Sequence, residues 1–259
     1  MKTIIIAAGR GQRLGSLTID IPKCLLSIIK NKNILDLQLS ALYANYINNI
    51  IIIKGYRAEK INYPLLKSYC NHDFENNNIL CSLMTAIDEM NVPFIASYSD
   101  IIYSKHVVKK LLDSPYDISV VVDTDWQTKY QGRTQHPETE AEKAIFDESG
   151  KILEMGKHLI NLPKNKNGEF IGLFKCSQKG AEIFCDAFKE AKSKFAQKKF
   201  FNASVFENAY ITDMMLYLIQ KEVSIHIVPI TERWMEIDTK QDLEKAKQWM
   251  QDEFFKWEV

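Results

Sequence analysis

Short runs of apolar residues alternate along the chain with segments in which apolar residues recur every three or four positions. The runs predict buried strands, and the periodic segments predict amphipathic helices. Strands are expected at 3–8, 48–55, 93–100, 117–125 and 223–230, and helices at 34–45, 79–90, 106–114, 179–197, 209–222 and 241–257. This alternation indicates an α/β fold, a Rossmann-like and mostly parallel mixed sheet flanked by helices.

The pattern changes between residues 126 and 175, where polar segments carry turn residues such as those in DESGKI and KNKNGEF. Polar turns between short apolar stretches are typical of hairpins. We therefore expect a small hairpin-rich subregion at the carboxyl edge of the sheet. No repeat and no low-complexity linker interrupts the sequence, so residues 1–259 are predicted to form one domain.

A glycine-rich stretch follows the first predicted strand, AAGRGQRLGSLTIDIPK at residues 7–23. A glycine-rich turn at the end of a buried strand exposes backbone N–H groups above the sheet. The cations Arg10, Arg13 and Lys23 add positive charge to the same turn, which favours a ligand with several phosphates. A ligand-free β-to-α turn is the alternative, and three cations in one turn argue against it.

The spacing of these glycines excludes two common phosphate-binding loops. Gly9, Gly11 and Gly15 are spaced G-x-G-x-x-x-G, whereas the dinucleotide fingerprint needs G-x-G-x-x-G and an acidic residue after the second strand. The second predicted strand ends instead in Lys54 and Gly55. A P-loop is excluded because no Gly-Lys pair is followed by Ser or Thr.

Composition narrows the class of protein further. The 46% of hydrophobic and 25% of charged residues are ordinary for a soluble globular protein. A net charge of zero argues against a nucleic-acid partner, and no apolar run approaches the roughly 18 residues of a membrane-spanning helix. The five cysteines are scattered and form no CxxC pair, so the sequence suggests neither a zinc site nor a disulfide framework. We expect a cytoplasmic protein with reduced, buried cysteines, and the oligomeric state stays open.

Two aspartates at predicted strand ends are candidate metal ligands. Asp100 ends the strand at 93–100, and Asp238 follows the last predicted strand. Mg²⁺ favours one or two carboxylates together with phosphate oxygens and water, so a triphosphate loop at the same edge makes both residues suitable. Each aspartate could instead cap a helix. Thr239 can cap the last helix, which leaves Asp238 free to face the site.

The sequence resembles the nucleotidyltransferase (sugar-nucleotide pyrophosphorylase) superfamily nearly from end to end, through AAGRGQRLG…PK, YSD at 98–100 and EIDT at 236–239. NNILCSL at 77–83 resembles an element of the cytidylyltransferases that activate phosphocholine and 2-aminoethylphosphonate. The segments around 125–143 and 168–172 resemble the acceptor-side segments of the same branch, including members that act on phosphoglutamine for capsular phosphoramidate. Cys81, at a usual aromatic position, and Thr124, at a common proline position, depart from this pattern.

The resemblance implies a reaction and a set of residues. An acceptor phosphate would attack the α-phosphorus of CTP in line and release pyrophosphate, with Mg²⁺ as the cofactor. The implied catalytic residues are Arg13, Lys23, Asp100 and Asp238, the two aspartates being the metal ligands. Residues 1–125 would form the CTP-binding half, 126–175 the acceptor side, and 176–259 the remaining helices and the last strand. The implied nucleotide contacts are Ala7, Ala8, Gly9, Gly11, Asn78 and Ser82.

The acceptor side is assigned to a second set of residues. Lys157 would meet the incoming phosphate, with Arg133 beside it, and an ammonium group would be received by Glu169, Trp126 and Trp234. Ordinary packing is the alternative for the tryptophans. The histidines show no metal-ligand spacing, so no catalytic role is expected for His136, His158 or His226.

Several functions remain open at this point. The main hypothesis is a cytidylyltransferase that acts on a small phosphorylated amine or amino acid, with L-glutamine phosphate preferred over phosphocholine and 2-aminoethylphosphonate. A sugar-1-phosphate nucleotidyltransferase would keep the fold and change both substrates. A non-catalytic nucleotide-binding subunit is the third hypothesis, although Lys23, Asp100 and Asp238 are all present.

Overall fold

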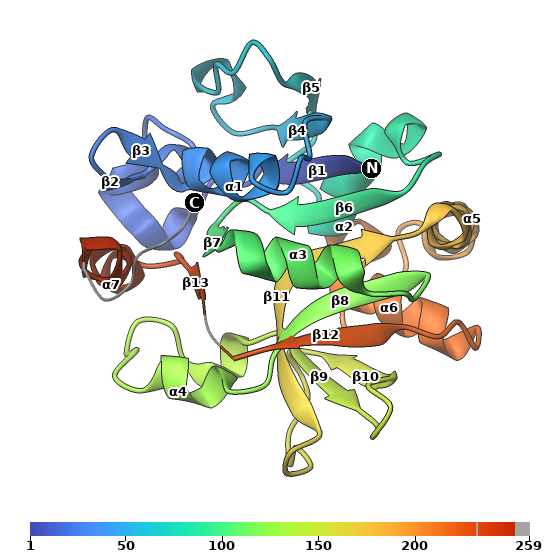
Figure 1. The fold of residues 1–259 in the computed structure, drawn as a ribbon. Coiled ribbons are helices and arrows are strands. Elements are labelled where there is room, and N and C mark those ends of the chain that lie inside the picture. Colours follow the sequence, from blue (N-terminus) through green and yellow to red (C-terminus); the bar gives the residue numbers. More distant parts are fainter. Residues whose placement is uncertain (232, 252–259) are drawn as a thin grey trace.

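The fold is built on a nine-stranded mixed sheet (Figure 1). The structure, a computed structural model, describes residues 1–231 and 233–251. Along the sheet the strands run in the order β10-β9-β11-β6-β1-β4-β5, and β8 joins β11 to β12. These strands are β1 (Lys2–Ala7), β4 (Ile50–Lys54), β5 (Lys67–Cys70), β6 (Phe94–Tyr98), β8 (Ile118–Asp123), β9 (Lys143–Phe146), β10 (Ile152–Gly156), β11 (Asn167–Cys176) and β12 (His226–Ile230).

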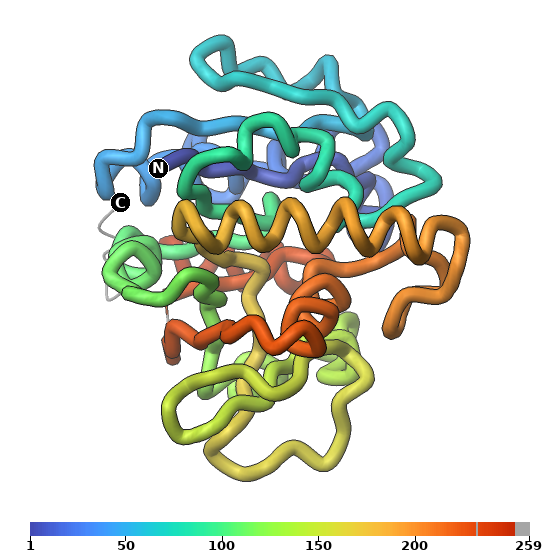
Figure 2. Tube along the Cα trace, turned by 90° about the vertical axis from the view of Figure 1, so that its right-hand side faces the viewer, coloured from blue at the N-terminus to red at the C-terminus, as the bar shows by residue number. Residues whose placement is uncertain are grey.

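Alternate residues of the buried strands supply two separate cores, one on each face of the sheet. Ile5 and Ala7 of β1 face one way and Ile4 and Ile6 face the other, as the two-residue period of a strand requires. On the first face lie α1 (Ile34–Tyr43) and α3 (Lys105–Asp113), and on the second lie α2 (Ile79–Leu83), α5 (Gln178–Phe195) and α6 (Ile211–Gln220). Figure 2 shows α5 running across the second face.

The α/β class and the flanking helices are confirmed. Strands β1, β4, β5 and β6 are mutually parallel, and β8 is parallel to β12. Strand β11 joins these two groups and is antiparallel to β6, β8 and β9. The hairpin expected on the acceptor side is β9 with β10, but β11 runs from that hairpin into the middle of the sheet. The acceptor side is therefore continuous with the central sheet.

Two predicted helices differ in detail from the structure. The helix expected at 79–90 is α2 followed by a 3-10 turn η4 (Met84–Glu89), because Ala86 leaves helical geometry. The last helix is described as α7 (Lys240–Gln251), and its predicted continuation to 257 lies outside the described residues. The helix expected to begin at Ile34 does so, with Asn33 and Asp36 forming a capping box.

Shorter elements complete the fold. The 3-10 turns η1 (Gln12–Thr18) and η2 (Lys23–Leu25) follow the glycine loop, and the hairpin of β2 (Ser27–Ile29) with β3 (Lys32–Asn33) leads into α1. The remaining elements are β7 (Ile101–Tyr103), β13 (Trp234–Glu236), α4 (Trp126–Tyr130), η3 (Ala58–Lys60), η5 (Glu138–Glu140) and η6 (Phe206–Asn208). Over residues 1–231 and 233–251, we find no helix with the length and apolarity needed to span a bilayer.

The end of β4 supports the start of the glycine loop. The backbone N–H of Tyr56 donates to the carbonyl of Ala8 across 2.9 Å. A Cβ at Gly55 would lie 2.6 Å from that same carbonyl oxygen, so only glycine lets the two backbones approach this closely. The loop after β1 is thereby held against the neighbouring parallel strand.

Gly55→Ala is expected to lower the free energy of unfolding by about 1–3 kcal/mol, because the added methyl group must displace the Ala8 backbone. Gly9→Ala is the matched control, since a Cβ there meets no atom within 4 Å. Urea unfolding of both variants measures the difference. Equal stability of the two variants would contradict the close approach.

Candidate active site

A cavity of about 290 Å³ lies at the carboxyl ends of β1 and β6 and extends toward the acceptor side. It collects side chains from segments far apart in the sequence, as expected at this edge of an open α/β sheet. The predicted site residues that line it are Ala7, Ala8, Gly9, Gly11, Arg13, Lys23, Asn78, Ser82, Asp100, Lys157, Glu169, Trp234 and Asp238.

Two predicted acceptor residues do not line this cavity. Trp126 is buried, donates from its indole N–H to Asn167 across 3.0 Å, and packs in a small cluster with Tyr130. Arg133 donates to Asp242 and Glu236, so its guanidinium is already paired. Trp126 is therefore a packing residue, as the alternative expected. Arg133 connects its own segment to residues 236–242 near the end of the chain.

The charged centre of the cavity is the ammonium group of Lys23. It lies 2.8 Å from Oδ2 of Asp100 and also forms an ion pair with Oδ1 of Asp238. Burial lowers the pKa of Lys23, but the charges and hydrogen bonds of the two aspartates outweigh burial and raise it above its usual value. Burial raises the pKa of Asp238, and Lys23, His136 and Arg13 bring it well below its usual range. Lys23 and Asp238 are therefore both charged at neutral pH.

The pairing of β7 with β13 brings the two aspartates together across the sequence. Asp100 directly precedes β7, Asp238 follows β13 by two residues, and the N–H of Ile237 donates to the carbonyl of Asp100. The turn before β7 is fixed from α1, because the buried Gln38 amide donates to the carbonyls of Tyr98 and Ile101, each across 2.7 Å.

Gly11 allows Lys23 to reach this centre. Its φ of +68° is a left-handed conformation that suits glycine, and a Cβ there would lie 3.2 Å from the Cβ of Lys23. The backbone of the loop therefore lies directly against the stem of the lysine. This contact places the glycine loop and the carboxylates on one wall of the cavity.

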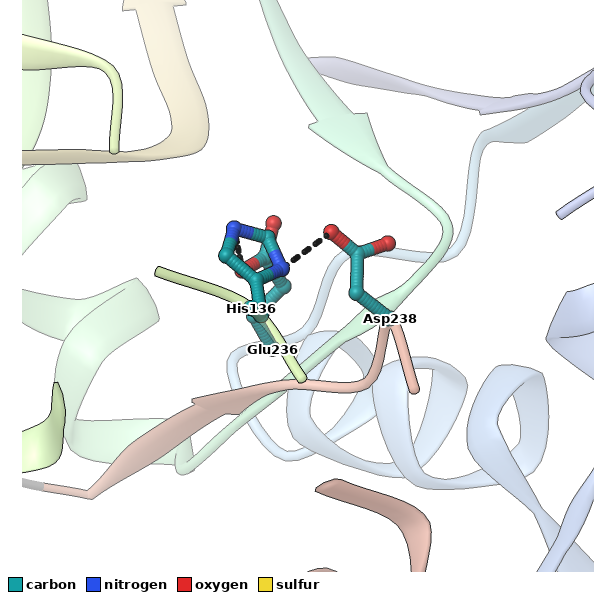
Figure 3. Close-up of side chains that lie close together, drawn as sticks. All are labelled: His136, Glu236 and Asp238. Atoms are coloured by element: carbon teal, nitrogen blue, oxygen red, sulfur yellow. Dashed lines mark ion pairs between the residues drawn. The ribbon is translucent and has the colours of Figure 1, made fainter. Parts of the chain in front are cut away.

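Arg13 and His136 contact the other oxygen of Asp238. Arg13 reaches Oδ2 of Asp238 at 2.7 Å, and its other terminal nitrogen lies 3.1 Å from Nδ1 of His136. Nδ1 of His136 is itself 3.0 Å from Oδ2 of Asp238, and its other ring nitrogen points toward Glu236 (Figure 3). His136 is buried in the site, although its spacing from the other histidines predicts no catalytic role for it.

Asn78 and Ser82 lie at the start of α2 and face the cavity. The side chain of Asn78 makes no cap hydrogen bond to α2 and donates instead to the carbonyl of Asn208. Ser82 is buried and accepts a hydrogen bond from the Asn71 amide across 2.9 Å. Both side chains are held in place by residues outside α2.

The acceptor side of the cavity combines one cation with several carboxyl groups. Lys157 lies 3.3 Å from Glu140 and 4.8 Å from the centre of the Tyr210 ring. Burial raises the pKa of Glu169 to about 7, although the hydroxyl of Tyr130 donates to it. The mixed charge suits an acceptor that carries both a phosphate and a cationic group.

Trp234 separates this cavity from a second one. Its indole N–H donates to the buried Asp123 across 2.7 Å, and the ammonium of Lys129 lies 5.1 Å from the centre of its ring. Trp234 and Glu169 line both cavities. The tryptophan therefore has a fixed orientation with part of its surface toward the acceptor side.

The residues fit a divalent cation at the two aspartates. Oδ1 of Asp100 is buried and has no hydrogen-bond partner among the described residues. The two carboxylates already converge on one cation, the ammonium of Lys23. Carboxylate oxygens are the ligands that Mg²⁺ prefers, so Asp100 and Asp238 form a suitable donor pair beside a phosphate loop.

The cysteines have no part in this chemistry. All five are free, and Cys24, Cys176 and Cys185 are buried as expected, whereas Cys70 and Cys81 are half-buried. Burial raises the pKa of Cys24, the cysteine that lines the cavity, to about 12. It therefore remains a thiol at neutral pH and is a poor nucleophile.

Several lining residues were not singled out from the sequence. Most of them lie inside motifs or segments used for the resemblance, which was an available signal: Asn77, Tyr98, His136, Glu140, Glu142 and Glu236. Phe74 and Tyr210 come from segments without a local signature and reach the cavity only through the tertiary fold.

Comparisons with known proteins agree with this geometry. A nucleotidyl transferase family model matches residues 2–97. The chain is 33% identical over 256 residues to the CTP:phosphoglutamine cytidylyltransferase of Campylobacter jejuni, covering 94% of this chain and 98% of that protein. It is 31% identical over 121 residues to the choline-phosphate cytidylyltransferase of Streptococcus pneumoniae, covering 45% of this chain and 52% of that protein.

Solved structures share the fold at lower identity. The CTP:phosphocholine cytidylyltransferase from Streptococcus pneumoniae superposes with a TM-score of 0.71 at 20% identity, over 95% of this chain and 97% of that one. A putative glucose-1-phosphate thymidylyltransferase from Bacillus anthracis gives a TM-score of 0.72 at 18% identity, over 97% and 96% of the two chains.

The near-complete match at 33% identity shows that the chain belongs to the nucleotidyltransferase family, in its cytidylyltransferase branch. It is therefore an enzyme of the transferase class, as the resemblance implied. Enzymes of this family generally use a divalent metal ion, which agrees with the donor pair of Asp100 and Asp238.

Glu142 generates a prediction about pH and stability. Burial raises its pKa to about 7, although the charge of Lys157 and hydrogen bonds from Thr212 and Tyr98 lower it. Because the pKa is higher in the folded than in the unfolded chain, the folded state holds the extra proton between about pH 4.5 and 7. As the pH rises from about 4.5 to 7, the free energy of unfolding of the wild-type enzyme should therefore fall relative to that of Glu142→Gln, by up to about 3 kcal/mol.

Urea unfolding at pH 4.5 and at pH 8 compares the two proteins. Glu75→Gln, at an exposed position, controls for the loss of one negative charge. A stability difference between wild type and Glu142→Gln that is the same at both pH values would contradict the raised pKa.

Proposed function

We propose that the enzyme transfers CMP from CTP to a small phosphorylated amine or amino acid, with L-glutamine phosphate as the preferred acceptor. The observation that carries this proposal is one cavity that joins the cationic glycine loop to an acceptor side with Lys157 and several carboxyl groups. The similarity over nearly the whole chain to a CTP:phosphoglutamine cytidylyltransferase supports the same acceptor.

The proposed reaction is a direct displacement at phosphorus. A phosphate oxygen of the acceptor forms a bond to the α-phosphorus of CTP while the bond from that phosphorus to the bridging oxygen of the β-phosphate breaks. Pyrophosphate leaves with the electron pair of the broken bond. The attacking group has a second pKa of about 6 and is already ionised near neutral pH, so no general base is needed. Catalysis then consists of alignment and charge neutralisation.

The loop residues bind and neutralise the triphosphate. Backbone N–H groups of Gly9 to Gly11 would cradle the β- and γ-phosphates, and Ala7 and Ala8 lie beside them on the cavity wall. Arg13 is half-exposed and would turn from Asp238 toward the phosphates. Lys23 is buried beside the loop and would offset the charge that develops at the α-phosphorus.

Mg²⁺ is the proposed metal, and Asp100 and Asp238 are the residues that would hold it. When bound, the ion would neutralise phosphate charge beside the site of attack. Within the protein, the aspartates also keep Lys23 charged and fixed in direction. The orphaned Oδ1 of Asp100 supports this assignment.

The remaining lining residues divide between the two substrates. Asn78 and Ser82 would contact the cytosine or the ribose, and Lys157 the acceptor phosphate. Glu169 and the face of Trp234 would receive the ammonium group. Trp126 and Arg133 have no acceptor contact in the proposal, because neither lines the cavity. Capsular phosphoramidate synthesis and a cytoplasmic location stay predictions from the resemblance.

Pyrophosphate release with a panel of substrates tests the proposal. CTP with L-glutamine phosphate should turn over best, ahead of CTP with phosphocholine or 2-aminoethylphosphonate. The same acceptors with UTP or dTTP serve as the nucleotide control. Faster turnover of UTP or dTTP with a sugar phosphate would refute the cytidylyltransferase proposal, and faster turnover of phosphocholine would change only the acceptor.

Lys23→Ala and Asp100→Asn should each reduce kcat by roughly 100-fold or more, because the first removes the charge that offsets the α-phosphorus and the second removes a proposed metal ligand. Lys110→Ala, on the exposed face of α3, is the control for the loss of one lysine. Single-turnover kinetics measures the chemical step, and circular dichroism confirms folding. Wild-type rates in either active-site variant would contradict the proposed mechanism.

A further inference from the structure

A short segment of the acceptor side is fastened to the turn that carries Asp238. This segment, residues 132–136, is called the clasp here. Arg133 donates from Nε to Oδ1 of Asp242 at 2.7 Å and from a terminal nitrogen to Oδ2 at 3.0 Å. The backbone N–H of Thr134 donates to the Gln241 side chain at 2.9 Å. Asp242 in turn accepts from the N–H of Asp238, so the clasp and the turn share hydrogen bonds.

His136 ends the clasp between two carboxylates. Nδ1 is 3.0 Å from Oδ2 of Asp238, and Nε2 is 3.9 Å from Oε2 of Glu236 (Figure 3). Nε2 is buried without a hydrogen-bond partner among the described residues. These three residues could offer ligands to a metal ion, since their atoms lie within 4.8 Å of one another. Nδ1 already lies at hydrogen-bond distance from Asp238, so the geometry favours a hydrogen bond at this nitrogen.

We propose that His136 is a positioning residue for Asp238. Its Nδ1 would hold Oδ2 of the aspartate, so that Oδ1 stays directed toward Lys23 and the proposed Mg²⁺. The clasp would thereby tie the acceptor side to the cation site. This inference rests on the proposed function, because the role of Asp238 as a metal ligand is part of that proposal.

The exposure of the two partners of Oδ2 favours His136 for this role. The side chain of Arg13 is 47% exposed, whereas that of His136 is 2% exposed. Nδ1 can serve only one hydrogen bond at a time, and Arg13 and Asp238 both lie within reach of it. A guanidinium can only donate to Nδ1, whereas Nδ1 donates to Asp238 when it carries the ring proton. Once Arg13 turns to the triphosphate, the tautomer with the proton on Nδ1 donates to Asp238. The imidazole is then the partner that remains at Oδ2.

Three substitutions distinguish the contribution of Nδ1 from that of Nε2. His136→Ala removes both, His136→Asn keeps a polar atom near the place of Nδ1, and His136→Gln keeps one near the place of Nε2. His106→Ala, at an exposed position on α3, is the control for the loss of a histidine. The readout is the Mg²⁺ dependence of the unfolding temperature with CTP present, which does not require turnover, together with kcat and the acceptor KM.

We expect the alanine and glutamine variants to need about 10-fold more Mg²⁺ to reach half of the full rise in unfolding temperature. This is the usual scale for the loss of a group that orients a metal ligand. The asparagine variant should recover most of this loss, kcat should follow the Mg²⁺ response, and the acceptor KM should change little.

Recovery by glutamine instead of asparagine, with a raised acceptor KM, would overturn the inference and show that Nε2 contacts the acceptor. Lower unfolding temperatures with an unchanged Mg²⁺ response would also overturn it, because His136 would then be a packing residue only. These outcomes leave the proposed function intact. A wild-type enzyme that gains no stability from CTP and Mg²⁺ would overturn the proposed function, and this inference with it.

Discussion

The cavity depends on one ionic contact, the ammonium of Lys23 between the carboxylates of Asp100 and Asp238. The lysine places a positive charge between two carboxylates that would otherwise repel each other. The contact is also expensive to break, because removing one partner leaves a charge without compensation in a largely buried place. The glycine loop, the turn before β7 and the end of β13 must therefore converge on a single point.

Short-range contacts outside the main sheet bring these three segments together. The short β7–β13 pairing joins residues more than a hundred positions apart in the sequence, and Gln38 fixes the turn beside it. Gly11 and Gly55 let backbones and the lysine stem approach where a side chain would interfere. The large parallel sheet supplies rigidity, whereas these local contacts set the geometry of the charged centre.

The parts of the molecule that follow from local patterning could be predicted from the sequence. The positions of the expected strands and of most expected helices agree with the structure, and the glycine loop lies at the same edge of the sheet as Asp100 and Asp238. Apolar periodicity and the motifs of the resemblance are both local patterns, which can be recognised in a single sequence. The features that could not be predicted depend on contacts between residues far apart in the sequence. Nothing near Arg133 in the sequence indicates Asp242 as its partner, so its charge was assigned to the acceptor. His136 has no metal-type spacing, and only the clasp brings it to Asp238.

The clasp has a consequence for recombination between members of this family. The loops proposed to meet the acceptor come from residues 126–175 and the glycine loop from residues 7–23, so the acceptor loops alone are an obvious segment to exchange between relatives. Arg133, Thr134 and His136 nevertheless form their contacts with residues 236–242, a separate stretch of the chain. A chimera that exchanges only the acceptor loops would join mismatched halves of this contact. We therefore expect that the clasp and residues 236–242 must be exchanged together if the contact with Asp238 is to form.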